Sequence, residues 1–179
     1  MKIIGTGLSG LVGSRIAELL KDKHEFVNVS TSTGFDITDR QKILDFFKSS
    51  DVSVVIHLAG KTDVDGCEKD KDLDSKILRI EDLDKQQEEF GKIKSAWSVN
   101  VTGTKNIVDA CAKTNKKLIY ISTDFVFDGE KKEPYTEEDA PSPVNWYGRT
   151  KYEGEKIVKE LKAPWSIVRI SFEYNWHMC

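Results

Sequence analysis

Apolar positions along the chain follow two different periods. Short apolar runs typical of buried strands occur at 2–4, 26–29, 52–58, 118–121 and 166–170. Segments with apolar residues three and four positions apart, typical of helices, begin at Leu11 and span 41–49, 96–114 and 146–161. Strands that alternate with helices form a parallel sheet through right-handed crossovers. The pattern therefore predicts an α/β fold in one domain covering residues 1–179.

The segment 69–94 differs in character, because fifteen of its 26 residues are charged. Leu73, Ile77, Ile80 and Leu83 fall at helical spacing, which predicts a charged amphipathic helix. Such an insert is a solvated surface helix, or else a lid or an oligomer contact. With so few apolar residues we expect it to bury little and to be dispensable for folding.

Composition bounds the function further. The 179 residues are 39% hydrophobic, with a net charge of −3, so neither nucleic acid nor an anionic membrane is an expected partner. No apolar run is long enough to span a bilayer, and a strand directly after Met1 leaves no room for a signal peptide. Three scattered cysteines suit a reducing, cytoplasmic setting, and the three histidines have no metal-ligand spacing.

A glycine turn follows the first strand. Gly7, Gly10 and Gly13 stand between that strand and the first helix, where glycines allow the backbone to approach a pyrophosphate. The start of the helix supplies N–H donors and a positive dipole end. The second strand ends in the four residues 30–33, Ser-Thr-Ser-Thr, which are neither acidic nor basic, so the choice between NAD and NADP stays open.

Two other stretches carry candidate chemistry. Tyr147 and Lys151 lie four residues apart on a predicted helix and therefore share one face. A nearby ammonium favours the phenolate, and Thr123, at a strand end, can bond the same substrate oxygen. Together they predict a proton donor and acceptor for a carbonyl and alcohol pair. Before them, the loop 125–145 holds three of the four prolines, and a loop of this length is usually functional.

Matching residues extend along nearly the whole chain outside the charged insert. They are Thr6, Gly7, Gly10 and Gly13; 36–39; Thr62, Val64, Asp65 and Glu68; Val99 and Asn100; 122–129; Pro134, Tyr135, Glu137 and Asp139; Pro143, Asn145, Tyr147, Gly148, Thr150, Lys151, Gly154 and Glu155. In these residues the chain resembles the extended short-chain dehydrogenase/reductase superfamily, and within it the dTDP-4-dehydrorhamnose reductases.

The resemblance implies a Rossmann-type doubly wound parallel sheet and hydride transfer from NADPH or NADH to the C4 carbonyl of a nucleotide-linked sugar. It implies that Tyr147 donates the proton, that Lys151 holds the nicotinamide ribose and lowers the Tyr147 pKa, and that Thr123 orients the carbonyl. The remaining implied cofactor contacts are Gly7, Gly10, Leu11 and Val12 near the pyrophosphate, Asp36 and Ile37 beside the adenine, and Leu58, Ala59 and Gly60 along the cofactor path. Asn100 is expected to support the site.

Members of that family continue for roughly a hundred more residues, so we expect this chain to lack most of the C-terminal substrate domain. Two alternatives stay open. One is a non-catalytic NAD(P)-binding subunit that resembles the regulatory subunit of methionine adenosyltransferase. The other is a sugar-nucleotide epimerase or dehydratase of the same superfamily. The expected partner is a nucleotide-sugar substrate, and the resemblance also allows a homodimer.

Overall fold

Five parallel strands form one sheet whose order reverses beside the first strand. The structure, a computed structural model, describes residues 1–171. The strands are β1 (Lys2–Thr6), β2 (Glu25–Val29), β3 (Val54–His57), β4 (Lys117–Thr123) and β5 (Trp165–Ile170), in the order β2-β1-β3-β4-β5. After β2 the chain crosses over β1 to reach β3, and this reversal is the switch point of a doubly wound sheet. The predicted Rossmann-type parallel sheet is confirmed.

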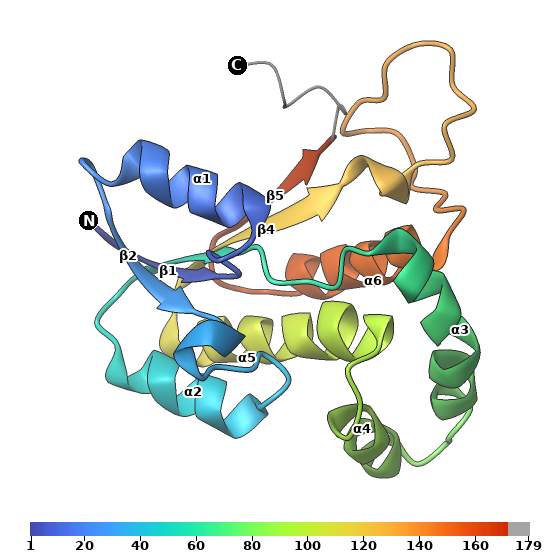
Figure 1. The fold of residues 1–179 in the computed structure, drawn as a ribbon, viewed down its shortest axis with the longest axis horizontal. Helices are drawn as coiled ribbons and strands as arrows, with labels where there is room; N and C mark the ends of the chain where they lie inside the picture. Colours follow the sequence, from blue (N-terminus) through green and yellow to red (C-terminus); the bar gives the residue numbers. More distant parts are fainter. Residues whose placement is uncertain (172–179) are drawn as a thin grey trace.

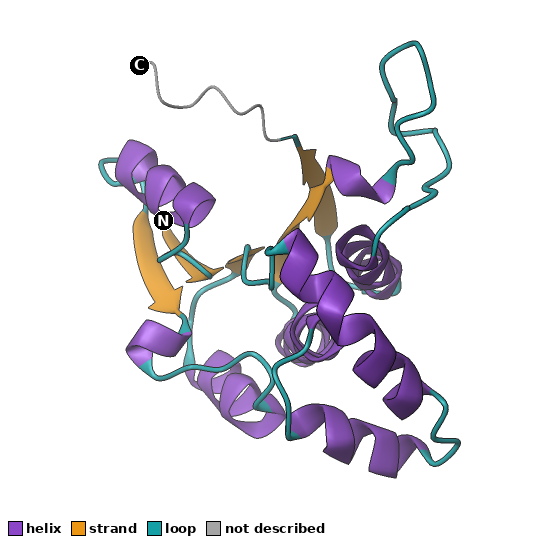
Figure 2. Cartoon of the chain, turned by 45° about the vertical axis from the view of Figure 1, so that its right-hand side comes forward, coloured by secondary structure: helices purple, strands orange, loops and turns teal. Residues whose placement is uncertain are grey.

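Helices cover both faces of the sheet. They are α1 (Leu11–Leu20), α2 (Arg40–Ser49), α3 (Val64–Leu78), α4 (Leu83–Gly91), α5 (Thr104–Thr114) and α6 (Trp146–Lys159). Figure 1 shows α2, α5 and α6 side by side on one face and α1 on the other. Three short turns complete the described elements: η1 (Thr31–Thr33), the π-helical η2 (Ser98–Gly103) and η3 (Asp124–Val126). The loop between η3 and α6 stands away from the sheet (Figure 2).

The main core lies between the sheet and the layer of α2, α5 and α6. Its fully buried side chains include Ile4, Val29, Val55, Leu118 and Tyr120 from the strands and Ile43, Phe47, Ile107 and Val158 from the helices. Burial of one such side chain stabilises the fold by about 1.5–3 kcal/mol. Cys111, one helical turn after Ile107, is also completely buried in this cluster. This layer fixes the ends of the strands relative to one another.

Local capping signals set where two of these helices begin. The Asp39 carboxylate accepts from the Lys42 N–H at 3.1 Å and starts α2. The Asn145 side chain accepts from the Gly148 N–H at 2.8 Å and starts α6. Tyr147 is therefore the second residue of α6, next to the ends of the strands. The single helix predicted over 96–114 is divided in the structure: Ser98–Gly103 is the π-helical η2, and the α-helix α5 follows from Thr104.

The structure corrects the prediction for the charged insert. In place of one helix over 69–94 it forms α3, which starts earlier at Val64, and α4, which begins after a break where the Asp82 side chain caps a new helix. The expectation of little burial holds for most of the segment, but three of its side chains are buried. Asp74 is completely buried, and Ile77 and Phe90 are 7% and 2% exposed. In the structure α3 contacts α6 and α4, while α4 contacts η2.

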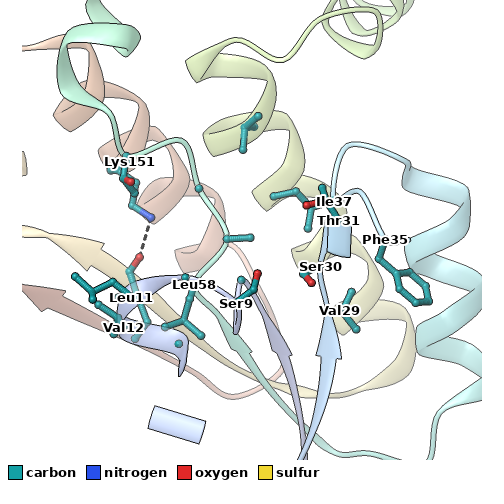
Figure 3. Close-up of a pocket in the computed structure, with 18 of the residues that line it drawn as sticks. Ser9, Leu11, Val12, Val29, Ser30, Thr31, Phe35, Ile37, Leu58 and Lys151 are labelled. Atoms are coloured by element: carbon teal, nitrogen blue, oxygen red, sulfur yellow. Dashed lines mark hydrogen bonds between the residues drawn. The ribbon is translucent and has the colours of Figure 1, made fainter. Parts of the chain in front are cut away.

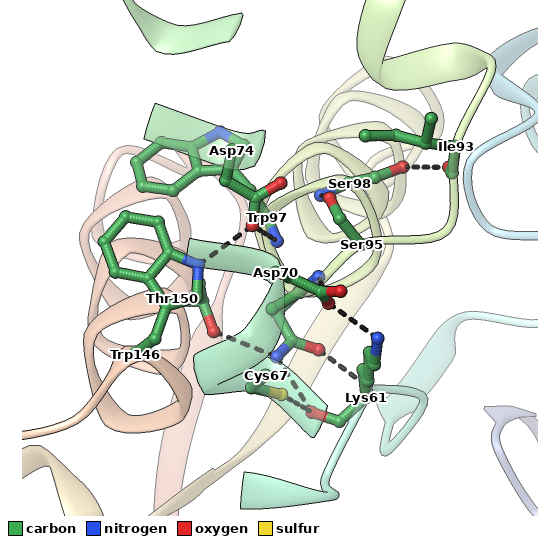
Figure 4. Close-up of polar contacts among 12 residues, drawn as sticks. Lys61, Cys67, Asp70, Asp74, Ile93, Ser95, Trp97, Ser98, Trp146 and Thr150 are labelled. Carbon is green, nitrogen blue, oxygen red and sulfur yellow. Dashed lines mark hydrogen bonds and ion pairs between the residues drawn. The ribbon is translucent and has the colours of Figure 1, made fainter. Parts of the chain in front are cut away.

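Carboxylates of α3 connect this insert to the rest of the chain. Asp74 Oδ2 accepts from the Trp97 N–H at 3.0 Å and from the Trp146 indole Nε1–H at 2.8 Å (Figure 4). Asp70 Oδ2 accepts from the Ala96 N–H at 2.7 Å. The rings of Trp97 and Trp146 stack beside Asp74 with centroids 5.8 Å apart. Because Trp146 is the first residue of α6, α3 helps to fix the start of that helix.

We predict that Asp74→Ala lowers the free energy of unfolding by about 3 kcal/mol, because it leaves two partly buried N–H donors without an acceptor. Urea denaturation measures the change. Asp72→Ala is the matched control, because Asp72 is exposed on the same helix and its loss should stay within about 0.5 kcal/mol. Equal unfolding midpoints for the two variants would show that the two hydrogen bonds to Asp74 do not stabilise the fold.

Candidate active site

A cavity of about 570 Å³ lies across the switch point, at the carboxyl ends of the strands. This volume is typical of small-molecule sites. Lys151 lies at one end of it, and Ser30, Thr31 and Ile37 lie at the other (Figure 3). All eleven residues that the sequence assigned to cofactor contacts line this cavity: Gly7, Gly10, Leu11, Val12, Asp36, Ile37, Leu58, Ala59, Gly60, Tyr147 and Lys151. The structure therefore places all of these residues at the cavity, and their contacts with a cofactor remain predictions.

The glycine turn forms the middle of the cavity wall. Gly7 has a φ of +72°, and a Cβ there would lie 2.7 Å from the Ala59 nitrogen at the end of β3. A Cβ on Gly13 would lie 2.5 Å from the Gly7 oxygen. Gly10 differs, because its Cβ would meet only that oxygen, at 3.3 Å. The space before Gly10 therefore belongs to the cavity.

The start of α1 is suited to an anion. Gly10 is its N-cap and has no side chain to accept from the first N–H groups of the helix. These donors, with the positive end of the helix dipole, favour a phosphate at this point. Because the start of α1 lies at the middle of the cavity, the cavity suits an elongated ligand with a phosphate at its centre.

At the β2 end the cavity carries hydroxyls and one ion pair. Asp36 Oδ2 lies 2.6 Å from Lys94 Nζ, and both residues line the cavity. Burial would raise the pKa of Asp36, but hydrogen bonds from Lys94 and Thr38 outweigh it and lower that pKa. Sequence reasoning missed Lys94, because it belongs to the charged insert and no spacing marks it.

At the β4 end Lys151 is buried and held in place. Its Nζ donates to the Ile121 carbonyl at 2.7 Å and lies 4.2 Å from the centroid of the Tyr120 ring. Burial lowers the pKa of Lys151 to about 7, while the carboxylate of Glu155 acts in the opposite direction. The ammonium group is therefore readily deprotonated near neutral pH.

Tyr147 corrects one sequence expectation. We expected Lys151 to lower the pKa of Tyr147, but burial of the phenol raises it, and only the Thr123 hydroxyl acts the other way. The reason is that the ammonium of Lys151 is directed at a carbonyl and a ring, while Tyr147 is 9% exposed. Thr123, the remaining predicted catalytic residue, is thus brought close to Tyr147.

Ser122 belongs to the matching run 122–129, but no role in the site was predicted for it from the sequence. It is 2% exposed, lines the cavity, and its hydroxyl has no hydrogen-bond partner among the described residues. A buried hydroxyl without a partner costs free energy, so a ligand oxygen at this point would relieve that cost. The sequence feature that could have pointed to Ser122 is its position directly before Thr123, which was predicted to be catalytic.

Asn100 joins three parts of the site from η2. Its Oδ1 accepts from the Lys61 N–H at 2.7 Å, and its Nδ2 donates to the Lys61 carbonyl and to Thr150 Oγ1, each at 3.0 Å. The loop after β3 and helix α6 are therefore held together through one buried amide. Asn100 was expected to support the site, and these three hydrogen bonds are the contacts through which it can do so.

The three histidines lie apart: His24 is half-buried just before β2, His57 is in the core, and His177 is outside the described residues. His57 is completely buried, with Nδ1 2.6 Å from Thr6 Oγ1, and burial lowers its pKa to about 3. Within residues 1–171 no group of histidine, cysteine and carboxylate side chains could hold a metal ion. His177 and Cys179, also considered in the sequence, lie outside the described residues.

A second cavity of about 530 Å³ lies beyond the end of β4. Its wall combines aromatic rings, carboxylates and one guanidinium: Phe125, Phe127, Tyr135, Asp124, Asp128, Glu137 and Arg169. Arg169 is neutralised by Glu155, through two bonds of 2.9 and 2.7 Å. The Phe125 ring contacts the Tyr147 ring with centroids 5.6 Å apart, so the two cavities adjoin at Tyr147.

Comparison with known proteins gives consistent matches. The family described as RmlD substrate binding domain matches residues 1–82 and 81–178. dTDP-4-dehydrorhamnose reductase of Mycolicibacterium smegmatis is 34% identical over 175 residues, 97% of this chain and 46% of that protein. The crystal structure of a dTDP-4-dehydrorhamnose reductase from Bacillus anthracis in complex with NADP has a TM-score of 0.77 and 32% identity, covering 95% of this chain and 53% of that one.

A different kind of relative matches part of the chain. Methionine adenosyltransferase 2 subunit beta of Rattus norvegicus is 46% identical over 81 residues, 45% of this chain and 24% of that protein. The chain spans about half the length of the curated relatives that match along it, 53% and 46% for the first two. None of the helices within residues 1–171 is both long and apolar enough to cross a membrane.

We predict that Lys151 titrates near pH 7 in the folded chain. The ordinary lysine pKa is about 10.4, so between these values the unfolded chain binds more protons and the free energy of unfolding rises with pH. NMR of ¹³C-labelled lysine side chains measures the titration, and Lys151→Met identifies the signal by its loss. The prediction fails if no lysine signal titrates below about pH 9.

Proposed function

Because the chain belongs to the RmlD substrate binding domain family, we propose that it reduces a nucleotide-linked 4-keto sugar with NADPH or NADH. The observation that carries this proposal is the cavity that joins the glycine turn to Tyr147 and Lys151. Dinucleotides bind at such switch points, and a phenol with a lysine at one end suits proton transfer. The relatives named as reductases support the same reaction.

The cofactor fits the cavity in one direction. The pyrophosphate would lie on the open space before Gly10, against the first N–H groups of α1. The nicotinamide half would then lie toward Tyr147 and Lys151, and the adenosine half toward Ser30 and Thr31. When bound, the reduced nicotinamide supplies a hydride. The Bacillus anthracis reductase structure holds NADP, which supports this class of cofactor.

The residues of the chain itself would supply the proton and the orientation. A raised pKa keeps the phenol of Tyr147 protonated at neutral pH, so it holds the proton that a carbonyl oxygen requires on reduction. Thr123, and the hydroxyl of Ser122 that lacks a partner, would hold that oxygen in place. Lys151 would contact the ribose and exchange protons at Tyr147.

The second cavity is the place where we put the sugar. It adjoins Tyr147 through Phe125, and its carboxylates, including Asp124 and Asp128, are acceptors for sugar hydroxyls. Its aromatic rings, stacked at Phe127 and Tyr135 with centroids 4.2 Å apart, offer a flat apolar face. A sugar in this cavity would bring its carbonyl to the phenol.

A second candidate function is that of a non-catalytic regulatory subunit. The identity of 46% over 81 residues with methionine adenosyltransferase 2 subunit beta favours it. In that case the cofactor cavity would be kept and the chain would act by binding a partner protein. Turnover separates the two candidates, because only the reductase consumes the reduced cofactor.

We propose a cytoplasmic location for this activity. Cys67 and Cys111 are buried and carry free thiols, and burial raises the pKa of the Cys67 thiol to about 11. Such unreactive thiols are compatible with a reducing compartment.

We predict that Gly10→Val weakens the binding of NADH and NADPH by about tenfold or more, because branched methyl groups would occupy the pyrophosphate space. Isothermal titration calorimetry measures both affinities. Gly91→Ala is the control, because a Cβ at Gly91 meets nothing within 4 Å and the position lies outside the cavity. Equal affinities in wild type and Gly10→Val would refute the placement of the pyrophosphate.

We predict that Tyr147→Phe abolishes oxidation of NAD(P)H by a 4-keto sugar nucleotide and leaves cofactor binding nearly intact. Single-turnover absorbance at the reduced nicotinamide band measures the step. Lys151→Ala should harm both binding and turnover, because Lys151 serves both. Tyr152→Phe, on the same helix but outside the cavity, is the control and should match wild type.

Two results would change the assignment. A Tyr147→Phe variant as fast as wild type would show that another group donates the proton. A wild-type protein completed with the C-terminal domain that its relatives carry, if it binds cofactor but turns over none of the 4-keto sugar nucleotides, would favour the regulatory subunit.

A further inference from the structure

The β2 end of the cavity holds a fixed acceptor beside a fixed donor. Asp36 and Lys94 lie 58 positions apart in the sequence, yet Asp36 Oδ2 and Lys94 Nζ are 2.6 Å apart. Both side chains line the cavity and remain partly open to it, with exposures of 36% and 56%. Each can therefore bond a ligand while the pair is intact.

The acceptor is held rigidly. Asp36 Oδ1 accepts from the Thr38 N–H at 2.8 Å and from Thr38 Oγ1 at 2.7 Å. Asn106 of α5 donates to the Ile37 carbonyl at 3.0 Å and to the Thr38 carbonyl at 3.2 Å. The carboxylate therefore presents its second oxygen in a defined direction.

The donor is held by the charged insert. Lys94 lies between α4 and η2, and Ser98 Oγ donates to the Ile93 carbonyl at 2.9 Å on one side of it. On the other side, Asp70 accepts from the Ala96 N–H at 2.7 Å. Of its three N–H donors, Lys94 Nζ uses one on Asp36 and one on Thr38, so the third is available to a ligand.

The position of this pair identifies the part of a dinucleotide that it meets. Groups at the end of the second strand of such folds contact the adenosine ribose, and here these are Ser30 and Thr31. Asp36 and Lys94 line the same end of the cavity, together with the apolar side chains of Ile37 and Val99. A flat base between apolar side chains would place its polar edge against the pair.

We propose that Lys94 is a base-reading residue, which donates to a purine ring nitrogen while Asp36 accepts from the amino group beside it. Adenine offers this pattern, an exocyclic amino donor next to ring-nitrogen acceptors. A 6-oxo purine has an oxygen where adenine has the amino group, and that oxygen would face the Asp36 carboxylate with both groups acting as acceptors. The inference rests on the proposed function in that it requires a dinucleotide in this cavity. It gives the charged insert a part in cofactor selection.

Calorimetry with three reduced dinucleotides tests the proposal: NADH, NADPH and nicotinamide hypoxanthine dinucleotide. Wild type should bind NADH about tenfold or more tightly than the hypoxanthine analogue. Lys94→Ala should weaken NADH and NADPH by the same factor, about tenfold, and the analogue by less than about twofold. Lys94→Arg, which keeps a donor, should retain part of the preference for adenine.

Lys92→Ala is the matched control. Lys92 lies in the same insert, pairs with Glu88 and Glu89 at 2.9 Å, and is not part of the cavity wall. It should leave all three affinities unchanged. Thermal melts of both variants confirm folding, because each ion pair is largely exposed and contributes little stability.

Four results would overturn the inference. Unchanged NADH binding in Lys94→Ala would show that Lys94 does not contact the cofactor. Equal weakening of the adenine and hypoxanthine dinucleotides would show that the role of Lys94 is only structural. A loss confined to NADPH would place Lys94 at the 2′-phosphate instead of the base. A wild type that binds none of the three dinucleotides would refute the proposed function itself, and the inference with it.

Discussion

The close approach of the glycine turn to the end of β3 is the contact on which the rest of the site depends. At Gly7 no side chain fits between the turn and Ala59, and Thr6 Oγ1 accepts from the Ala59 N–H at 3.2 Å. This contact sets the direction in which α1 leaves the sheet and opens a cavity on both sides of the switch point. A larger residue at Gly7 would separate the two strand ends and divide the cavity wall.

Burial decides the electrostatics at the β4 end of that cavity. It disfavours the charged form of both neighbours, so the pKa of Tyr147 rises while that of Lys151 falls to about 7. A protonated phenol next to a lysine that is readily deprotonated suits donation to a carbonyl oxygen more than abstraction from an alcohol. Arg169 remains charged because Glu155, also buried, pairs with it through two bonds. The site therefore combines one neutral proton donor, the phenol of Tyr147, with the mutually neutralised ion pair of Arg169 and Glu155.

The charged insert contacts both ends of the site. Through Asp74 it holds the indole of Trp146, next to Tyr147, and through Lys94 it reaches Asp36 at the other end of the cavity. A segment composed mostly of charged residues can do this because Asp74 is buried against specific donors and Lys94 pairs with a carboxylate of the cavity wall, while most of the other charges are exposed. Whether a charged side chain of the insert forms a specific contact or stays in water depends on where the tertiary fold places it.

The sequence by itself determined the features that neighbouring residues control. The strand and helix periods, the glycine turn and the spacing of Tyr147 and Lys151 depend on residues a few positions apart, and the structure has them where they were predicted. Tertiary structure alone decided that the insert breaks into two helices, that Lys94 meets Asp36, that Ser122 lacks a partner, and that the pKa of Tyr147 rises. These outcomes depend on burial and on partners far away in the sequence. Local pattern carries no information on either, because both come into being only when the chain packs.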